Sequence, residues 1–233
     1  MTEEVARRKD IIRNSIGVGV AVGAYGLSFG ALGTTNGLSV LQTQLLSLLL
    51  FSGASQFAVV SIVGAGGSAV SAIASTALLG MRNGLYALRL APLLKVRGVR
   101  RLIAAQITID ESTAMALAQE DAKDSSHASV KVGFWAAGAS VYVLWNLATL
   151  IGAVGAQHIA DPKQFGLDAA IPAGFAALVA PRLTSRTTRV LGFGCAIAAV
   201  AATPFVAPGV PVLIAASITL VLALVSARRE GGR

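Results

Sequence analysis

The most constraining feature of the sequence is an uncharged run of 68 residues. Positions 14–81 contain no Asp, Glu, Lys or Arg. One membrane-crossing helix needs only about 20 mainly apolar residues, so the run is long enough for two or three crossings. In hydrocarbon each backbone polar group must be satisfied within the protein, which favours helices. We therefore expect an all-α integral membrane protein.

Composition supports one membrane domain over residues 1–233. The chain is 55% hydrophobic and 13% charged, and its net charge of +8 is confined to loops and ends. Basic loops favour an anionic cytoplasmic membrane leaflet as partner, and the charge pattern does not indicate nucleic acid. Cys195 is the single cysteine, which excludes an internal disulfide or a thiolate metal cluster. The basic start resembles a signal peptide, but the rest is equally apolar, so we expect a retained first helix.

Hydropathy and turn residues predict about seven transmembrane helices. The first contains Gly19, Gly23, Gly26 and Gly30 at the four-residue spacing of a close helix–helix face. The second is long enough to be tilted or broken. The third can extend past residue 81 as far as Pro92, which would end it. The seven expected spans are residues 16–33, 38–63, 68–81, 132–155, 166–181, 190–207 and 209–227.

Basic clusters give the expected orientation. Cytoplasmic loops are enriched in Lys and Arg, so residues 95–101, 183–189 and 228–233 are predicted to be cytoplasmic. With seven spans the N-terminus is then external, which leaves the basic residues before position 14 as an exception. A re-entrant segment in the first half would remove that exception. Seven spans also allow a 3+3 inverted repeat plus one helix, with broken helices.

The second span is interrupted by small and polar residues, and they have two interpretations. Gly53, Ala54, Ser55 and Gln56 lie within an otherwise apolar segment. Small residues let two helices pack closely. Alternatively, a helix that breaks at Gly53 exposes backbone groups that are tolerated only beside protein or a cavity, as in transporter substrate sites.

Other candidates for a substrate site lie later in the chain. Pro172 stands near the start of the short fifth span and predicts a second broken helix, and Asn146 is a polar group deep in the fourth span. Either could contact a substrate, although Asn146 could equally bond another helix. Arg82 and Arg89 share a helix face and either reach the lipid headgroups or contact an anionic group of the substrate.

Three acids are candidates for carrying a coupled proton. Asp168 opens the fifth span, where it could equally be stabilised by the helix dipole. Asp110 and Glu111 lie next to apolar sequence, and acids drawn into a membrane are usually functional. Glu111 has a second interpretation, because Thr108 and Glu111 fit a capping box that would begin a helix running to about residue 122.

Several of these stretches together resemble the AzlC family of bacterial branched-chain amino acid exporters. The resemblance is carried by residues 51–57 (FSGASQF), 81–86 (MRNGLY), 110–112 (DES) and 166–173 (GLDAAIPA). It implies export of leucine, isoleucine, valine or related apolar amino acids, together with a small AzlD-type membrane subunit. Asn83 departs from the family pattern, in which a histidine commonly follows the arginine.

Three functions are compatible with parts of this sequence pattern. A secondary transporter would bind the carboxylate at helix N-termini near Gly53 and Pro172 and the ammonium at carbonyls with Gln56 or Asn146. An intramembrane serine protease could use Ser55, but it needs a histidine at matching depth, and the chain has only His127 and His158. A structural or assembly subunit would have no site of its own. No phosphate-binding glycine loop is present, so we expect an ion-driven transporter without enzymatic activity, cofactor or metal.

Overall fold

The computed structural model describes residues 2–122, 126–158, 176, 179–180 and 183–230. Within these residues every element is a helix, so the expected all-α class is confirmed for this part of the chain. The helices are α1 (Thr2–Thr35), α2 (Val40–Leu49), α3 (Gly53–Gly64), α4 (Ala69–Leu94), α5 (Val99–Gln106), α6 (Asp110–Glu120), α7 (His127–Ala156), α9 (Arg186–Ala202) and α10 (Val210–Glu230).

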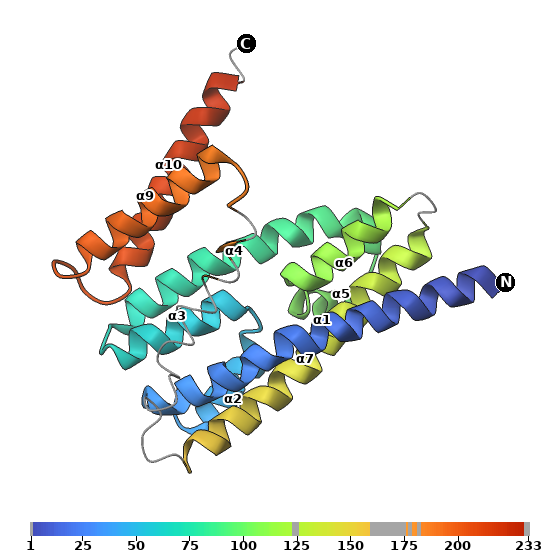
Figure 1. The fold of residues 1–233 in the computed structure, drawn as a ribbon, viewed down its shortest axis with the longest axis horizontal. Helices are drawn as coiled ribbons and strands as arrows, with labels where there is room; N and C mark the ends of the chain where they lie inside the picture. The colour runs from blue at the N-terminus through green and yellow to red at the C-terminus, as the bar shows by residue number, and fades with distance from the viewer. Residues whose placement is uncertain (1, 123–125, 159–175, 177–178, 181–182, 231–233) are drawn as a thin grey trace.

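The centre of the fold is a parallel pair formed by α1 and α7 (Figure 1). Gly19 of α1 lies against Ser140 of α7, and Gly30 lies against Thr149, so residue numbers rise together along the pair. A Cβ at Gly30 would overlap the Thr149 carbonyl oxygen. The glycine face expected from the four-residue spacing is therefore confirmed, and α7 is its partner.

The segment expected to be one membrane span, residues 38–63, is instead a helical hairpin. α2 starts beside the end of α1 and runs to the middle of α7, where the Leu48 carbonyl accepts a hydrogen bond from Tyr142 Oη at 3.2 Å. α3 then returns, and Gly64 packs against Asn36. With 10 and 12 residues, the helices are only about 15 and 18 Å long. The helix break expected before Gly53 is confirmed. The expectation that residues 38–63 cross from one end of the fold to the other is wrong. Hydropathy could not show this, because a hairpin and a single crossing can be equally apolar.

α4 runs the whole way back to the end where α1 begins. Its last residues, Leu90 and Leu94, pack with Val130 and Phe134 near the start of α7. Pro92 lies inside the last turn of α4, so the helix ends two residues beyond the expected stop. The C-cap is Lys95, which has a left-handed backbone with φ 51° and ψ 40°.

α5 and α6 form a second hairpin that enters from the opposite end. α5 leads from Lys95 toward the middle, where Gln106 Nε2 donates to the Leu48 carbonyl at 2.8 Å. α6 returns toward the start of α7, and Arg89 of α4 pairs there with Glu120 at 2.6 Å. The two hairpins thus meet at their tips in the middle of the fold.

The start of α6 differs from the expected capping box. The N-cap is Ile109, and its backbone N–H donates to Ser112 Oγ at 3.0 Å, so Ser112 has the part assigned to Glu111. Thr108 Oγ1 instead donates to the Ala104 carbonyl at 2.7 Å. Thr108 therefore completes the end of α5, which is why it does not cap α6. The helix ends at Glu120, close to the predicted residue 122.

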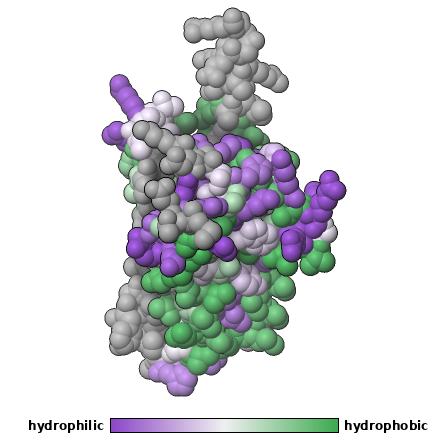
Figure 2. Space-filling model, turned by 90° about the vertical axis from the view of Figure 1, so that its right-hand side faces the viewer, coloured by the Kyte–Doolittle hydropathy of each residue, from purple (hydrophilic) through white to green (hydrophobic). Residues whose placement is uncertain are grey.

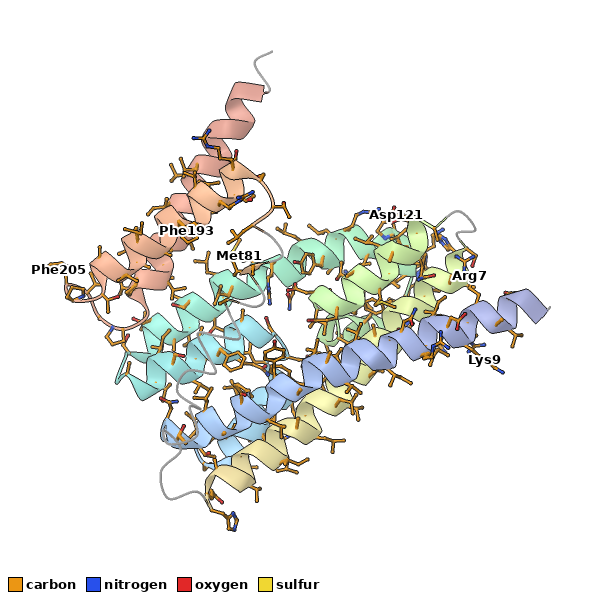
Figure 3. The ribbon with its side chains drawn as sticks, in the orientation of Figure 1. Arg7, Lys9, Met81, Asp121, Phe193 and Phe205 are labelled. Atoms are coloured by element: carbon orange, nitrogen blue, oxygen red, sulfur yellow. The ribbon has the colours of Figure 1, made fainter. Side chains whose placement is uncertain are left out.

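The basic start of α1 lies at the same end of the molecule as residues 95–101. Figure 2 views this end, where hydrophilic residues gather mainly across the upper half and hydrophobic residues below. Figure 3 labels Arg7 and Lys9 of α1 and Asp121, which follows α6, at this same end of the molecule. The structure therefore contradicts the external N-terminus expected with seven spans and agrees with the re-entrant alternative, because α2–α3 turns back and only α1 and α4 run from end to end between the two segments.

The two helix-plus-hairpin units run in opposite directions. α1 with α2–α3 starts at one end, and α4 with α5–α6 starts at the other. An inverted arrangement thus occurs within residues 2–120, whereas the predicted partner segment containing Pro172 lies outside the described residues. α9 and α10 form a separate pair whose connecting turn packs on α4, where Ser75 Oγ donates to the Gly209 carbonyl at 3.3 Å.

Candidate functional site

A cavity of about 80 Å³ lies where the tips of the two hairpins meet between α1, α4 and α7. It contains both the first residues of α3 and the first residues of α6. The positive ends of two helix dipoles therefore face one small space. The cavity is lined by Val22, Tyr25, Phe51, Gly53, Ala54, Phe57, Arg82, Ile109, Asp110, Glu111, Val141 and Trp145.

The helix break before α3 is stabilised by side chains that donate hydrogen bonds to the carbonyl groups at the end of α2. The last carbonyls of a helix lack intrahelical donors and need other partners when they are buried. Gln56 Nε2 donates to the Leu46 and Ser47 carbonyls at 3.3 and 3.2 Å. Gln106 and Tyr142 donate to the Leu48 carbonyl at 2.8 and 3.2 Å. The interrupted backbone is thus stabilised by α3, α5 and α7 together.

The first turn of α3 is left without a side-chain cap. Its N-cap, Ser52, has extended backbone and makes no side-chain hydrogen bond to the helix. The Ser52 hydroxyl instead bonds with Ser55 Oγ at 3.1 Å, and Ser55 Oγ donates to the Thr76 carbonyl of α4 at 3.2 Å. Gly53 and Ala54 line the cavity, and the first N–H groups of a helix are groups that bind anions.

The charged side of the cavity comes from α4 and α6. Arg82 Nη1 pairs with Asp110 Oδ2 at 2.8 Å, and their side chains are 33% and 21% exposed. Glu111 follows on the same lining. The buried Arg82 Nε has no hydrogen-bond partner among the described residues. The site therefore presents a guanidinium with a spare donor next to two carboxyl groups.

Aromatic residues form another part of the cavity lining. Phe57 packs edge-on against Phe29 and Trp145, with ring centroids 5.5 and 6.2 Å apart, while Phe29 stacks on Trp145 at 6.0 Å. Phe51 packs edge-on against Tyr142 at 4.9 Å. Trp145 is buried, and in the described part of the chain its Nε1 has no hydrogen-bond partner. This wall offers apolar contact together with one spare N–H donor.

The structure brings together five of the residues singled out in the sequence: Gly53, Ala54, Arg82, Asp110 and Glu111. Four others lie outside the cavity lining. Ser55 and Gln56 are fully buried behind it. The Asn146 side chain bonds to α7 and α2, through the Tyr142 carbonyl at 2.8 Å and Gln44 Nε2 at 3.4 Å. Arg89 pairs with Glu120 nearer the surface. Pro172 and Asp168 lie outside the described residues.

Two residues of the site are not among the candidates that the sequence indicates: Trp145 of the cavity lining, and Gln106, which joins the hairpins. Polarity within an apolar span is the available signal for a site, and it indicates Asn146 and not its neighbour Trp145. Gln106 was not singled out at all. A polar residue in the apolar stretch of residues 102–109 was the available signal, since such a group needs a partner at depth.

In the part of the chain that the structure describes, the fold and site define an all-helical protein. Two hairpins of short helices, α2–α3 and α5–α6, meet at a cavity that is lined by charged and aromatic residues. A family model described as AzlC protein matches residues 17–159, more than half of the chain, and the chain belongs to the AzlC family. The match extends from α1 past the end of α7, so it includes both hairpins and the cavity. Family membership supports a membrane-associated role related to amino-acid transport. Comparisons with curated proteins and with solved structures gave no match.

Proposed function

We propose that this protein exports branched-chain or related apolar amino acids across the bacterial cytoplasmic membrane as a multi-pass transporter. Family membership supports the general role. Two described helices, Glu4–Thr35 and His127–Ala156, are long and apolar enough to cross a bilayer. Many large apolar side chains are exposed, among them Leu49, Val70, Leu88 and Phe205. Such extensive apolar exposure suits a lipid environment better than water.

The single observation that carries the proposal is the composition of the central cavity. An apolar amino acid has a carboxylate, an ammonium group and a hydrocarbon side chain. Arg82 and the start of α3 would bind the carboxylate. Asp110 and Glu111 would bind the ammonium, and the Phe51, Phe57 and Trp145 wall would contact the side chain.

The size of the cavity suggests a closed conformation. A cavity of about 150 Å³ accommodates benzene, whereas this one holds about 80 Å³. Binding leucine would therefore require the hairpin tips to separate. A zwitterion entering between them would replace the Arg82–Asp110 contact with two new ion pairs, so neither charge would be left unpaired.

Export against a gradient needs an energy source, and the proposal assigns it to protons or the membrane potential. Moving one charge through 100 mV supplies about 2.3 kcal/mol. Asp110 and Glu111 line the cavity and are proposed proton carriers. Asp168 remains a prediction. We further propose a small AzlD-type membrane subunit as partner.

Two alternatives are less well supported. A structural or assembly subunit would not need charged and aromatic groups gathered around a cavity. For a serine protease, Ser55 would need a general base. Its hydroxyl instead bonds with Ser52 and Thr76, while His127 and His158 lie at opposite ends of α7. We therefore propose a transporter without enzymatic activity.

Export is tested by efflux from cells. Cells that express this chain with its small partner, and matched cells without it, are fed dipeptides containing leucine, isoleucine or valine. The expected result is faster efflux of at least one of the three amino acids. Unchanged efflux of all three would contradict the substrate assignment and favour the structural-subunit alternative.

The fold also predicts which positions face the same side of the membrane. In a Cys195→Ser background, cysteines replacing Glu4 and His127 should both resist impermeant thiol reagents in intact cells, because the starts of α1 and α7 lie together. Cysteines replacing Ala65 and Gln157, at the other end, should label readily. Opposite labelling of the Glu4 and His127 positions would contradict the parallel pair. The cytoplasmic side is assigned from the basic residues.

A further inference from the structure

A second cavity, lined by four cationic side chains, lies apart from the central site. It has a volume of about 620 Å³ and is formed by the end of α4, the start of α5 and the first turns of α7. Its cations are Lys95, Arg97, Arg100 and Lys131, and Trp135 completes its polar lining. Among the lining residues that the structure describes there is no carboxylate. We call this the basic groove.

The cations of the basic groove make no ion pair with any acid that the structure describes. Of the acids at this end, Asp10 and Glu120 are already paired with Arg13 and Arg89. Four like charges around one hollow repel each other, so an anion there would be stabilised.

The backbone that forms the groove adopts a costly conformation. Lys95 is the one non-glycine residue with positive φ among those described. A left-handed backbone costs an L-residue free energy that glycine avoids, and such positions cluster at functional sites. Gly98, with φ 56°, then begins α5. The tight connection places the three cations of residues 95–100 around one hollow.

An apolar surface adjoins the cations. Val99, Leu102 and Ile103 share one face of α5 and are all exposed, Val99 and Leu102 by 71%. Arg100 and Arg101 occupy the other face. Trp135 is half-buried against Phe134, with ring centroids 5.4 Å apart, and tryptophan favours the boundary between headgroups and hydrocarbon. A ligand that fits both surfaces has an anionic head and hydrocarbon chains.

We infer that the basic groove binds the headgroup of an anionic phospholipid, with its acyl chains against the exposed face of α5. The inference rests on the proposed membrane location, but not on any transported substrate. A free phosphate would use the cations and leave the apolar face unused. The groove would hold the tip-forming α5–α6 hairpin to the membrane surface.

The test measures the apparent melting temperature of the purified protein in detergent micelles. These are titrated with phosphatidylglycerol, with phosphatidylcholine of the same acyl chains, or with inorganic phosphate. The altered protein carries Arg97→Gln, Arg100→Gln and Lys131→Gln. The control carries Arg186→Gln and Arg189→Gln, which are exposed cations at the start of α9. Equal melting temperatures of the variants without added lipid check that both fold.

Phosphatidylglycerol should stabilise the native and control proteins and outperform phosphatidylcholine. Each cation near an anionic lipid surface strengthens binding about fivefold, so the triple variant should bind about a hundredfold more weakly. Equal stabilisation of the triple variant would overturn the inference. Full stabilisation by inorganic phosphate would also overturn it, because the site would then recognise the anion alone. If the triple variant is not stabilised by phosphatidylglycerol but still exports amino acids normally, the lipid site and the proposed export are independent.

Discussion

Replacing Arg82 with methionine is expected to reduce amino-acid export at least tenfold while leaving the protein inserted. Methionine keeps much of the chain length but removes the guanidinium, whose Nη1 pairs with Asp110 and whose Nε has no partner among the described residues. A hydrogen bond to a charged group contributes about 1.5–3 kcal/mol, which corresponds to about a 10- to 150-fold change in affinity. Efflux of leucine at matched protein abundance provides the measurement.

Two further substitutions separate a specific role from general damage. Arg82→Lys should retain partial export, because lysine supplies the charge without the planar array of donors. Arg89→Met removes a similar ion pair from the same helix, but the Arg89 side chain is 52% exposed. Such pairs contribute at most about 1 kcal/mol, so export should remain near normal. Equal loss in the Arg82 and Arg89 variants would contradict the central-cavity assignment.

The second large effect is expected at the contact between α1 and α7. Gly30→Ala should destabilise the protein by about 1–3 kcal/mol or more, because the new methyl group would overlap the Thr149 carbonyl and force two helices apart. Gly152→Ala should behave similarly, since its methyl group would meet the Leu27 carbonyl. The measurement is the apparent melting temperature in detergent, which should fall by about 2–4 °C per kcal/mol.

Gly17 provides a matched control within the same helix. A Cβ at Gly17 would meet no atom within 4 Å. Alanine is more favourable than glycine inside a helix by about 0.5–1 kcal/mol, so Gly17→Ala should leave the melting temperature unchanged or raise it. Gly30→Ala is therefore expected to lower the melting temperature, whereas Gly17→Ala is not. A Gly30→Ala protein as stable as Gly17→Ala would show that the helices do not pack as described.

The sequence predicted the elements whose signals are local. The spacing of Gly19, Gly23, Gly26 and Gly30 predicted a close helix contact, and α7 fills it. Gly53, among small polar residues, predicted a helix break, and α3 begins there. Each signal depends on residue size or backbone freedom within a few positions, so it can be recognised without knowing the fold.

The path of the chain between these elements could not be predicted. Residues 38–63 are apolar whether they cross a membrane or fold back, and the return depends on carbonyl partners that are distant in sequence. Gln106 and Tyr142 supply those partners from α5 and α7. For the same reason the cavity was only half anticipated. Arg82 and Asp110 are each recognisable as ionisable residues beside apolar sequence, but nothing in the sequence indicates that they pair across 28 positions.

The binding of leucine to purified protein tests most directly whether the central cavity recognises a zwitterionic apolar amino acid. Labelled leucine is displaced by unlabelled leucine, by leucinamide, which lacks the carboxylate, or by 4-methylpentanoate, which lacks the ammonium. The account predicts saturable binding, with each analogue competing at least tenfold more weakly because it loses one charge-assisted contact. Equal competition by leucine and 4-methylpentanoate, or leucine binding unchanged in Arg82→Met, would contradict it.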